Sequence, residues 1–467
     1  MHIEKDCIGS LTLDDDLLYG IHTTRALHNF PISSEKTNPL IFNNLIQIKK
    51  AAALVNLKAG SLGIPQAKAI VAACNQLLLG KYTNALVAPA IQGSAGTSVN
   101  MNVNEVIAKL AMKLNPQVFV HPNDDVNQSQ STNDVFPTAG KMAMLQALSE
   151  LQAMVAKLVT AWEAKARTYS DVIKVGRTQL QDAVPTTFGH TFNAYGALFK
   201  RDLRRLTQVK ADLQSVNLGG TAIGTGLNTS PYYQQNILAT LNRLTGLNLT
   251  SAPDLMDATQ NCDSFVEFSG VLKTLAVNLS KVSNDLRLMA SGPQAGLNEL
   301  HLPAKQAGSS IMPGKVNPVI PEVVNQVAFE VIGHDVTVGM AAEAGQLELN
   351  AFEPIIFRDI LQSEAYLTRA IDTLITNCVT GITVNTAKCD HDVQNSAISA
   401  TVLAPKLGYA RTTTLVKEAL TTETPIKTLL REKGIFDEVT LTALFSKASL
   451  TNAKQTSTPE LTADQNH

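Results

Sequence analysis

The sequence predicts a mainly α-helical protein organised around a bundle of long helices. Three stripes of apolar residues step alternately by three and four positions, as one face of a helix does, at 148–162, 188–213 and 265–289. The stripe from Phe265 to Met289 keeps this alternation without a break, which suits near-parallel packing against other long helices. Strands and helices do not alternate along the chain, so a parallel sheet is not expected.

Further helices are expected on both sides of these stripes. Apolar periodicity indicates helices at 38–60 and 65–80 before them, and at 392–403, 411–420 and 425–433 after them. A fourth long helix should begin at Pro321, because proline is tolerated in the first turn of a helix, and a fifth should follow Pro354.

The change of pattern along the chain predicts three domains. An N-terminal domain is expected over 1–140, a central helical-bundle domain over 141–390, and a small C-terminal helical domain over 391–467. The last of these ends in a polar tail from Asn452, which is expected to fray.

The composition argues against several classes of protein. The net charge is −2 and no block of Lys and Arg stands out, which argues against a nucleic-acid binder. No run of 18 apolar residues exists, and Glu4, Lys5 and Asp6 stand where the apolar region of a signal peptide would begin. Neither the five cysteines nor the nine histidines are spaced as metal ligands. We therefore expect a cytoplasmic protein without a membrane span. Because only 17% of its residues are charged, it should bury surface against other subunits.

Residues 308–318, which read GSSIMPGKVNP, combine more special residue types than any other stretch. Glycine permits backbone conformations that other residues avoid, and Pro313-Gly314 is a turn dipeptide. The stretch should be a loop that presents two hydroxyls, one ammonium and one amide, although an ordinary connector could have the same composition. A phosphate-binding P-loop is excluded, because five residues instead of four separate its glycines and Val316 stands where magnesium would need Ser or Thr.

Further polar segments, each expected to be a loop, precede this one in a fixed order. They are the GTS and NMN runs of 96–102, HPND at 121–124, STN at 131–133, GRTQLQDAVP at 176–185 and LGGTAIGTGLN at 218–228. Together with residues 308–318, which match the pattern GSSxMPxKxNP, they resemble the aspartase/fumarase superfamily. The resemblance extends over nearly the whole chain, so it is far more specific than any one motif.

Within the superfamily the chain is most similar to the aspartate ammonia-lyases, which convert L-aspartate reversibly to fumarate and ammonia. Fumarate hydratases typically have GTQ where this chain has Gly96-Thr97-Ser98. They have THTQDATP where this chain has TQLQDAVP at 178–185, and NPTQCE where it has NPVIPE at 317–322.

The resemblance implies a three-domain aspartase/fumarase-type fold, with the helical bundles forming a twenty-helix core in a homotetramer. Each active site would collect loops from three different subunits. The reaction removes a proton from the carbon beside the β-carboxylate and so forms a doubly charged aci-carboxylate, which preorganised donors must stabilise. Neither a cofactor nor a metal is expected, because hydroxyl and amide donors that converge can supply this stabilisation.

The resemblance also assigns roles to individual residues. Ser309 would be the general base, with its anion stabilised by backbone N–H groups of its loop and by Lys315. The other assignments are Thr97, Ser131, Thr132 and Ser310 to the β-carboxylate, Thr178, Lys315 and Asn317 to the α-carboxylate, and Asn133 to the amino group. Taken singly, each Ser, Thr or Asn could be an ordinary turn or cap residue.

The sequence also indicates roles for three further residues. Gln179 occupies a position where many superfamily members have histidine, and glutamine cannot give a proton to a leaving hydroxide. It is therefore predicted to hydrogen-bond the substrate, which fits loss of ammonia better than loss of water. Glu322 could orient Lys315 or the loop, or simply be a carboxylate at a helix start. Arg25 could pair with a substrate carboxylate or form a structural ion pair.

Two alternatives remain open at this point. One is a fumarate hydratase, or another lyase of the superfamily that acts on a related dicarboxylate; comparing malate with aspartate separates it from the first hypothesis. The other is a helical assembly protein that keeps the fold without the activity. The intact loop motifs argue against this second alternative.

Overall fold

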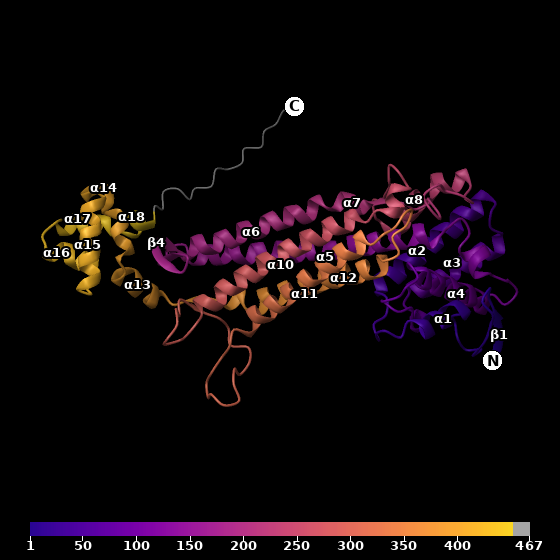
Figure 1. Ribbon diagram of the computed structural model, residues 1–467, viewed down its shortest axis with the longest axis horizontal. Helices are drawn as coiled ribbons and strands as arrows, with labels where there is room; N and C mark the ends of the chain where they lie inside the picture. The colour runs from indigo at the N-terminus through magenta and orange to yellow at the C-terminus, as the bar shows by residue number, and fades with distance from the viewer. Residues whose placement is uncertain (452–467) are drawn as a thin grey trace, which may run out of the picture. The chain divides into compact units, whose positions relative to one another are not determined.

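The computed structural model describes residues 1–451, which fold into two compact units. The first unit comprises Met1–Met154, Asp202–Val277 and Gln326–Arg369; the second comprises Val155–Arg201, Asn278–Asn325 and the described chain from Ala370 onwards. Each of the long helices contributes residues to both units: α5 (Thr132–Thr168), α6 (Phe188–Gln208), α10 (Asp263–Met289), α11 (Val319–Glu343) and α12 (Glu353–Asn377) (Figure 1). The mainly α-helical fold class is thereby confirmed. Among the described residues, no helix combines the length and the apolar character that crossing a membrane requires.

The rest of the first unit is built from shorter elements. Its helices are α1 (Ile21–Asn29), α2 (Pro39–Ala59), α3 (Ile64–Leu78), α4 (Thr97–Leu114), α7 (Lys210–Gln214), α8 (Pro231–Thr245) and α9 (Asp257–Gln260), with η1 (Thr83–Ala85) and η2 (Pro122–Val126). Its strands are the antiparallel pair β1 (His2–Lys5) and β2 (Ser10–Leu13), and the parallel pair β5 (Ser215–Val216) and β6 (Thr250–Ser251). Both helices predicted near the N-terminus are thus present, and the one parallel pair in residues 1–451 is only two residues long.

The rest of the second unit consists of two antiparallel strand pairs and a group of short helices. The strands are β3 (Ile173–Thr178) with β4 (Gln181–Thr187), and β7 (Leu300–His301) with β8 (Thr383–Val384). The helices are η3 (Val379–Gly381), α13 (Thr386–Asn395), η4 (Ala397–Val402), α14 (Ala404–Leu407), α15 (Tyr409–Thr421), α16 (Ile426–Glu432), α17 (Glu438–Leu444) and α18 (Lys447–Thr451).

Aromatic side chains join the long helices inside each unit. In the first unit the Phe357 ring of α12 lies 5.1 Å, centroid to centroid, from both Phe136 of α5 and Phe265 of α10. In the second unit Trp162 of α5 stacks on Phe192 of α6 at 5.5 Å. All eight residues of the predicted stripe from Phe265 to Met289 are buried, which confirms that this stripe is core.

The structure differs from the sequence predictions in three places. The stripe over 188–213 is not one helix, because α6 ends at Gln208 and the short α7 follows. The segment at 176–185, read as a polar loop, belongs to the β3–β4 hairpin. The helix expected over 392–403 ends at Asn395 and gives way to the 3₁₀ helix η4. The tail from Asn452, expected to fray, lies outside the described residues.

Glu353, the first residue of α12, should make the stability of the protein depend on pH. Its carboxyl is buried, and burial raises its pKa from the ordinary 4.5 to about 8, with the Lys141 ammonium offsetting part of the shift. A raised carboxyl pKa contributes stability below pH 4.5 that is lost as the pH rises towards 8. Glu353→Gln, which stays neutral, should therefore gain stability relative to the natural protein between these pH values.

Urea unfolding across this pH range measures the difference. Glu267→Gln is the matched control, because it makes the same change at an exposed position of α10. Parallel stability curves for the natural protein and Glu353→Gln would contradict the expectation.

Candidate active site

Two helix N-termini in the first unit carry four of the predicted site residues: Thr97, Ser131, Thr132 and Asn133. Helix α4 begins at Thr97 and α5 at Thr132, and Asn100 Nδ2 of α4 donates a 3.0 Å hydrogen bond to Thr132 Oγ1. Ser131 Oγ accepts a 3.2 Å hydrogen bond from the Asn133 N–H. Because both hydroxyl oxygens already accept a bond, their own hydrogens can be donated to a ligand. Two helix dipoles and two such hydroxyls suit an anion.

Gly96 allows the first turns of α4 and α5 to approach each other closely. Its φ of +87° lies in the left-handed region, and a Cβ at this position would come within 2.4 Å of the Phe136 ring. Both the backbone conformation and the contact therefore require glycine. This contact fixes where Thr97 lies relative to the start of α5.

Asp134 anchors the turn that carries Ser131 and Thr132. Its Oδ1 accepts a 2.9 Å hydrogen bond from the Ser131 N–H, and its Oδ2 accepts bonds of 3.0 and 3.2 Å from the N–H groups of Gly219 and Thr221. The carboxyl is buried, and burial raises its pKa to about 6. The sequence reasoning overlooked Asp134, although Ser131 followed three residues later by an acidic residue is a recognised signal of a helix start.

Asn133 contacts the loop over residues 217–228. Its Nδ2 donates a 2.8 Å hydrogen bond to Ala222 O, and its backbone oxygen accepts a 2.9 Å bond from Asn217 Nδ2. The loop is therefore held against the start of α5. Since Nδ2 is already engaged, Oδ1 is the atom through which Asn133 would contact a substrate ammonium, for which an acceptor is the right partner.

Thr178 and Gln179 lie at the tip of a β-hairpin in the second unit. Thr178 pairs with Gln181, so Gln179 and Leu180 form a two-residue turn. Their φ angles are +52° and +63°, a conformation that favours Asn and Gly and is strained for larger side chains. The turn leaves Thr178 and Gln179 exposed.

A buried charge cluster supports this hairpin. Glu299 is fully buried, and its Oε1 accepts a 2.8 Å hydrogen bond from Arg177 Nη1, while Lys174 Nζ lies 3.1 Å from Oε2. The Lys174 ammonium also lies 5.0 Å from the centroid of the Phe188 ring. Because Arg177 directly precedes Thr178, the cluster fixes the base of the turn that presents Thr178 and Gln179.

Residues 308–318 form a loop that is closed at its base. The Gly308 N–H donates a 2.7 Å hydrogen bond to Lys315 O, and Asn317 Nδ2 donates a 2.8 Å bond to Gly308 O. A Cβ on Gly308 would lie 2.7 Å from the same Lys315 oxygen, so this position requires glycine. Asn317 thus uses one amide hydrogen to close the loop and keeps the second for a ligand.

Ser309 lies just inside this closure, with its hydroxyl facing backbone donors. Its Oγ accepts hydrogen bonds of 3.1 and 3.0 Å from the N–H groups of Ile311 and Met312. The same two donors would stabilise an anion on Oγ, although an ordinary serine turn has this geometry too. Ser310 and Lys315 are exposed on the same loop.

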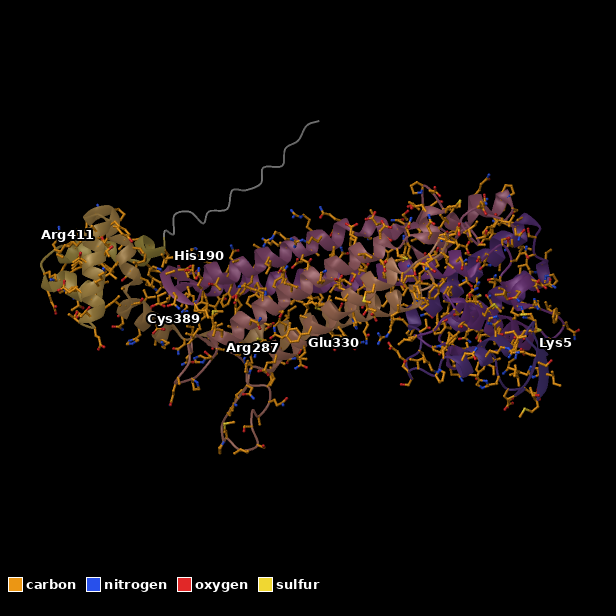
Figure 2. The ribbon with its side chains drawn as sticks, in the orientation of Figure 1. Lys5, His190, Arg287, Glu330, Cys389 and Arg411 are labelled. Atoms are coloured by element: carbon orange, nitrogen blue, oxygen red, sulfur yellow. The ribbon has the colours of Figure 1, made fainter. Side chains whose placement is uncertain are left out.

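Glu322 lies in the first turn of α11, which begins at Val319, two residues before the predicted start. It borders a cleft together with Lys315 and with Arg287 near the end of α10. Figure 2 labels Arg287 beside the loops that follow α10. The cleft therefore brings Glu322 close to the loop over residues 308–318.

The guanidinium of Arg25 forms an ion pair within the protein. Its Nε and Nη2 donate to the two carboxylate oxygens of Asp6 at 2.7 and 3.0 Å, and this pairing lowers the pKa of Asp6 to about 2. Of the two roles considered for Arg25, the structural ion pair is the one that the structure contains.

The predicted residues thus fall into three groups. Thr97, Ser131, Thr132 and Asn133 come together at the starts of α4 and α5 in the first unit. In the second unit, Thr178 and Gln179 lie on the hairpin, and Ser309, Ser310, Lys315, Asn317 and Glu322 lie on the loop and the start of α11. Within residues 1–451, no hydrogen bond or ion pair joins the hairpin tip to the 308–318 loop.

Comparison with known proteins places these motifs in a family. Residues 9–333 match the family model described as Lyase, and residues 400–452 match the one described as Fumarase C C-terminus. The aspartate ammonia-lyase of Helicobacter pylori is 47% identical over 457 residues, which cover 96% of this chain and 98% of the relative. The aspartate ammonia-lyase of Bacillus subtilis is 43% identical over 454 residues, with 96% of each chain covered.

Solved structures show the same relationship. The structure described as fumarate lyase:delta crystallin from Brucella melitensis bound to cobalt has a TM-score of 0.92 and 46% identity, over 95% of this chain and 98% of that one. The class II fumarase from Schistosoma mansoni also has a TM-score of 0.92, but only 31% identity, over 97% and 99% of the two chains. This chain belongs to the aspartate ammonia-lyase family of the aspartase/fumarase superfamily.

Proposed function

We propose that this protein is an aspartate ammonia-lyase, a carbon–nitrogen lyase that converts L-aspartate reversibly to fumarate and ammonia. The observation that carries the proposal is the pair of helix N-termini at Thr97 and Thr132, where hydroxyl hydrogens are available to a carboxylate. The near full-length identity to relatives of this name supports it.

The proposed chemistry begins at Ser309. Its Oγ, as the alkoxide, takes the proton from the carbon beside the β-carboxylate, and the Ile311 and Met312 N–H groups stabilise the alkoxide beforehand. The electron pair of the broken C–H bond moves into the carboxylate, which becomes the aci-carboxylate. The donors proposed for that dianion are the hydroxyls of Thr97, Ser131, Thr132 and Ser310.

The second half of the reaction breaks the carbon–nitrogen bond. The electron pair returns from the aci-carboxylate to form the double bond of fumarate, and the amine leaves with the bonding pair of the C–N bond. Asn133 Oδ1 is proposed to accept a hydrogen bond from the ammonium, while Thr178, Lys315 and Asn317 hold the α-carboxylate. Glu322, which borders the same cleft as Lys315, is proposed to orient this lysine.

Gln179 favours loss of ammonia over loss of water. Hydroxide is a poor leaving group and needs a proton donor, which a glutamine amide is not. An amine that leaves from its protonated form needs none. Gln179 lies on an exposed, strained turn, and its amide is proposed to hydrogen-bond the substrate.

The proposal includes a homotetramer in which each site combines the three groups of residues from three subunits. An exposed apolar stripe supports such an assembly: Phe329, Val336 and Met340 of α11 are 63%, 58% and 69% exposed. Their spacing puts them on one face of the helix, as in packing against helices of a second copy. Sedimentation equilibrium measures the assembly directly. The division into domains at residues 140 and 390 stays a prediction. A cytoplasmic location is also part of the proposal, and the five free cysteines support it.

Parallel assays with L-aspartate and L-malate test this function. We expect the ultraviolet absorbance of fumarate to rise with aspartate and without any added cofactor, and to stay flat with malate. Fumarate formed from malate in preference to aspartate would identify a hydratase instead. Absence of signal from both substrates, in a folded protein, would contradict the proposal altogether.

A further inference from the structure

A buried lysine lies behind the turn that carries Ser131 and Thr132. Lys49 of α2 is 0% exposed, and its Nζ donates a 2.8 Å hydrogen bond to Asn127 Oδ1. A buried ammonium is costly unless polar groups satisfy it, so its position indicates a specific task. Nothing in the proposed chemistry uses Lys49 directly.

Asn127 connects this lysine to the site through several partners. Its Oδ1 also accepts hydrogen bonds of 3.2 Å from Asn100 Nδ2 and from Asn104 Nδ2. Its Nδ2 donates a 3.2 Å bond to Gln130 O, and Asn100 Nδ2 also donates to Thr132 Oγ1. Both sides of the turn over residues 130–132 therefore depend on the position of Asn127.

The hydrogen bonds form one directional chain from Lys49 to Asp134. Lys49 donates to Asn127, and Asn127 donates to the carbonyl of Gln130. The N–H of the same peptide unit, which belongs to Ser131, donates to Asp134 Oδ1 at 2.9 Å. Bonds that run in one direction polarise and strengthen each other, especially in a buried setting. The chain thus ties the peptide at the head of the turn between a donor and a carboxylate.

The charges at the two ends fit this arrangement. Burial lowers the pKa of Lys49 to about 7, and the nearby Asp134 carboxylate offsets part of this shift. Burial also raises the pKa of Asp134 to about 6. Lys49 can act as the donor to Asn127 in either protonation state, because a neutral amine still carries N–H groups.

We propose that Lys49 is a positioning residue: through Asn127 it holds the 130–132 turn so that Ser131 and Thr132 present their hydroxyl hydrogens to a dicarboxylate. This inference rests on the proposed function for the identity of that ligand. The contact runs through asparagine side chains, so Lys49 itself does not touch the substrate.

The test compares Lys49→Met, which removes the donor and keeps the length, with Lys50→Met, the same change one residue along at a partly exposed position. Calorimetry with succinate measures dicarboxylate binding without turnover, and the aspartate assay gives KM and kcat. Lys49→Met should weaken succinate binding and raise KM roughly 5- to 150-fold, the range for a buried polar group that loses a hydrogen-bond partner. Lys50→Met should change neither.

A second variant keeps the test decisive if Lys49→Met does not fold. Asn127→Asp keeps the acceptor for Lys49 but removes the donor to Gln130. It should weaken succinate binding as Lys49→Met does, and the double variant should bind no more weakly than the weaker single one, because both changes break the same chain.

The outcomes distinguish this inference from the proposed function. Succinate binding within twofold of the natural protein in folded Lys49→Met, or in Asn127→Asp where Lys49→Met does not fold, would overturn it. So would a natural protein that binds no succinate. Loss of binding in the variants, in a protein that binds succinate but forms no fumarate from aspartate, would support the positioning role while the proposed function fails.

Discussion

Replacing Ser309 with alanine should lower kcat for aspartate about 10²- to 10⁴-fold, the usual contribution of a positioned acid–base group. The variant loses the one oxygen on the 308–318 loop that two backbone N–H groups stabilise. The proposed carboxylate donors stay in place, so KM should change little. Fumarate formation measured by ultraviolet absorbance gives kcat, and succinate calorimetry shows that the site still binds.

Ser446→Ala provides the matched control. Ser446 Oγ accepts a hydrogen bond from the Ser449 N–H at 3.3 Å, so it is another serine whose hydroxyl accepts from the backbone, far along the chain. Its loss should cost about 1 kcal/mol of stability and leave kcat unchanged. A Ser309→Ala variant with turnover like that of Ser446→Ala would remove Ser309 as the base.

The scaffold could be predicted well from periodicity. The stripe from Phe265 to Met289 required only that apolar residues on one face of a helix become buried, and all of them are. The hairpin at 173–187 was missed because its strands contain Gly, Arg, Gln and Asp, and its turn uses Gln179 and Leu180 in place of the usual Asn and Gly. Local propensity disagreed with the tertiary structure at this place, and such disagreement is typical of functional sites.

Only those residues of the candidate site that lie in recognisable motifs could be predicted from the sequence. Ser309, Thr132 and Gln179 belong to motifs that resemble those of a known family, so the sequence alone indicated that they are candidate site residues. Lys49 and Glu299 could not be found in this way, because their partners lie far away along the chain: Arg177 and Glu299 are 122 residues apart, and Lys49 and Asn127 are 78 apart. No local pattern encodes such pairs.

These distant pairs share one physical role. The groups proposed to touch substrate are mostly neutral hydroxyls and amides on turns, which would reorient easily if unsupported. The hydrogen bonds that run from Lys49 to Asp134 support the turn over residues 130–132. Glu299, with Lys174 and Arg177, supports the turn of the β3–β4 hairpin. In the proposed mechanism, buried charges held by several bonds fix the donors before the dianion forms, which is how preorganised electrostatic stabilisation avoids a reorganisation cost.

Glu299→Gln should therefore be strongly destabilising and should also impair the site. The change leaves the buried Lys174 ammonium and the Arg177 guanidinium without their shared counter-charge, a situation that costs about 3–5 kcal/mol. Urea unfolding measures this loss as a lower midpoint with an unchanged slope. Because Arg177 precedes Thr178, KM for aspartate should rise as the hairpin tip loses its support.

Glu163→Gln is the control that distinguishes the loss of a buried ion pair from the loss of a surface one. Glu163 pairs with Lys200 at 2.6 Å on the surface of the same unit, where their side chains are 33% and 59% exposed. Removing that pair should change stability by no more than about 1 kcal/mol. Adding Lys174→Met to Glu299→Gln should restore part of the lost stability, because it removes the buried cation that Glu299 neutralised. Equal midpoints for Glu299→Gln and Glu163→Gln would show that the buried cluster does not hold the hairpin.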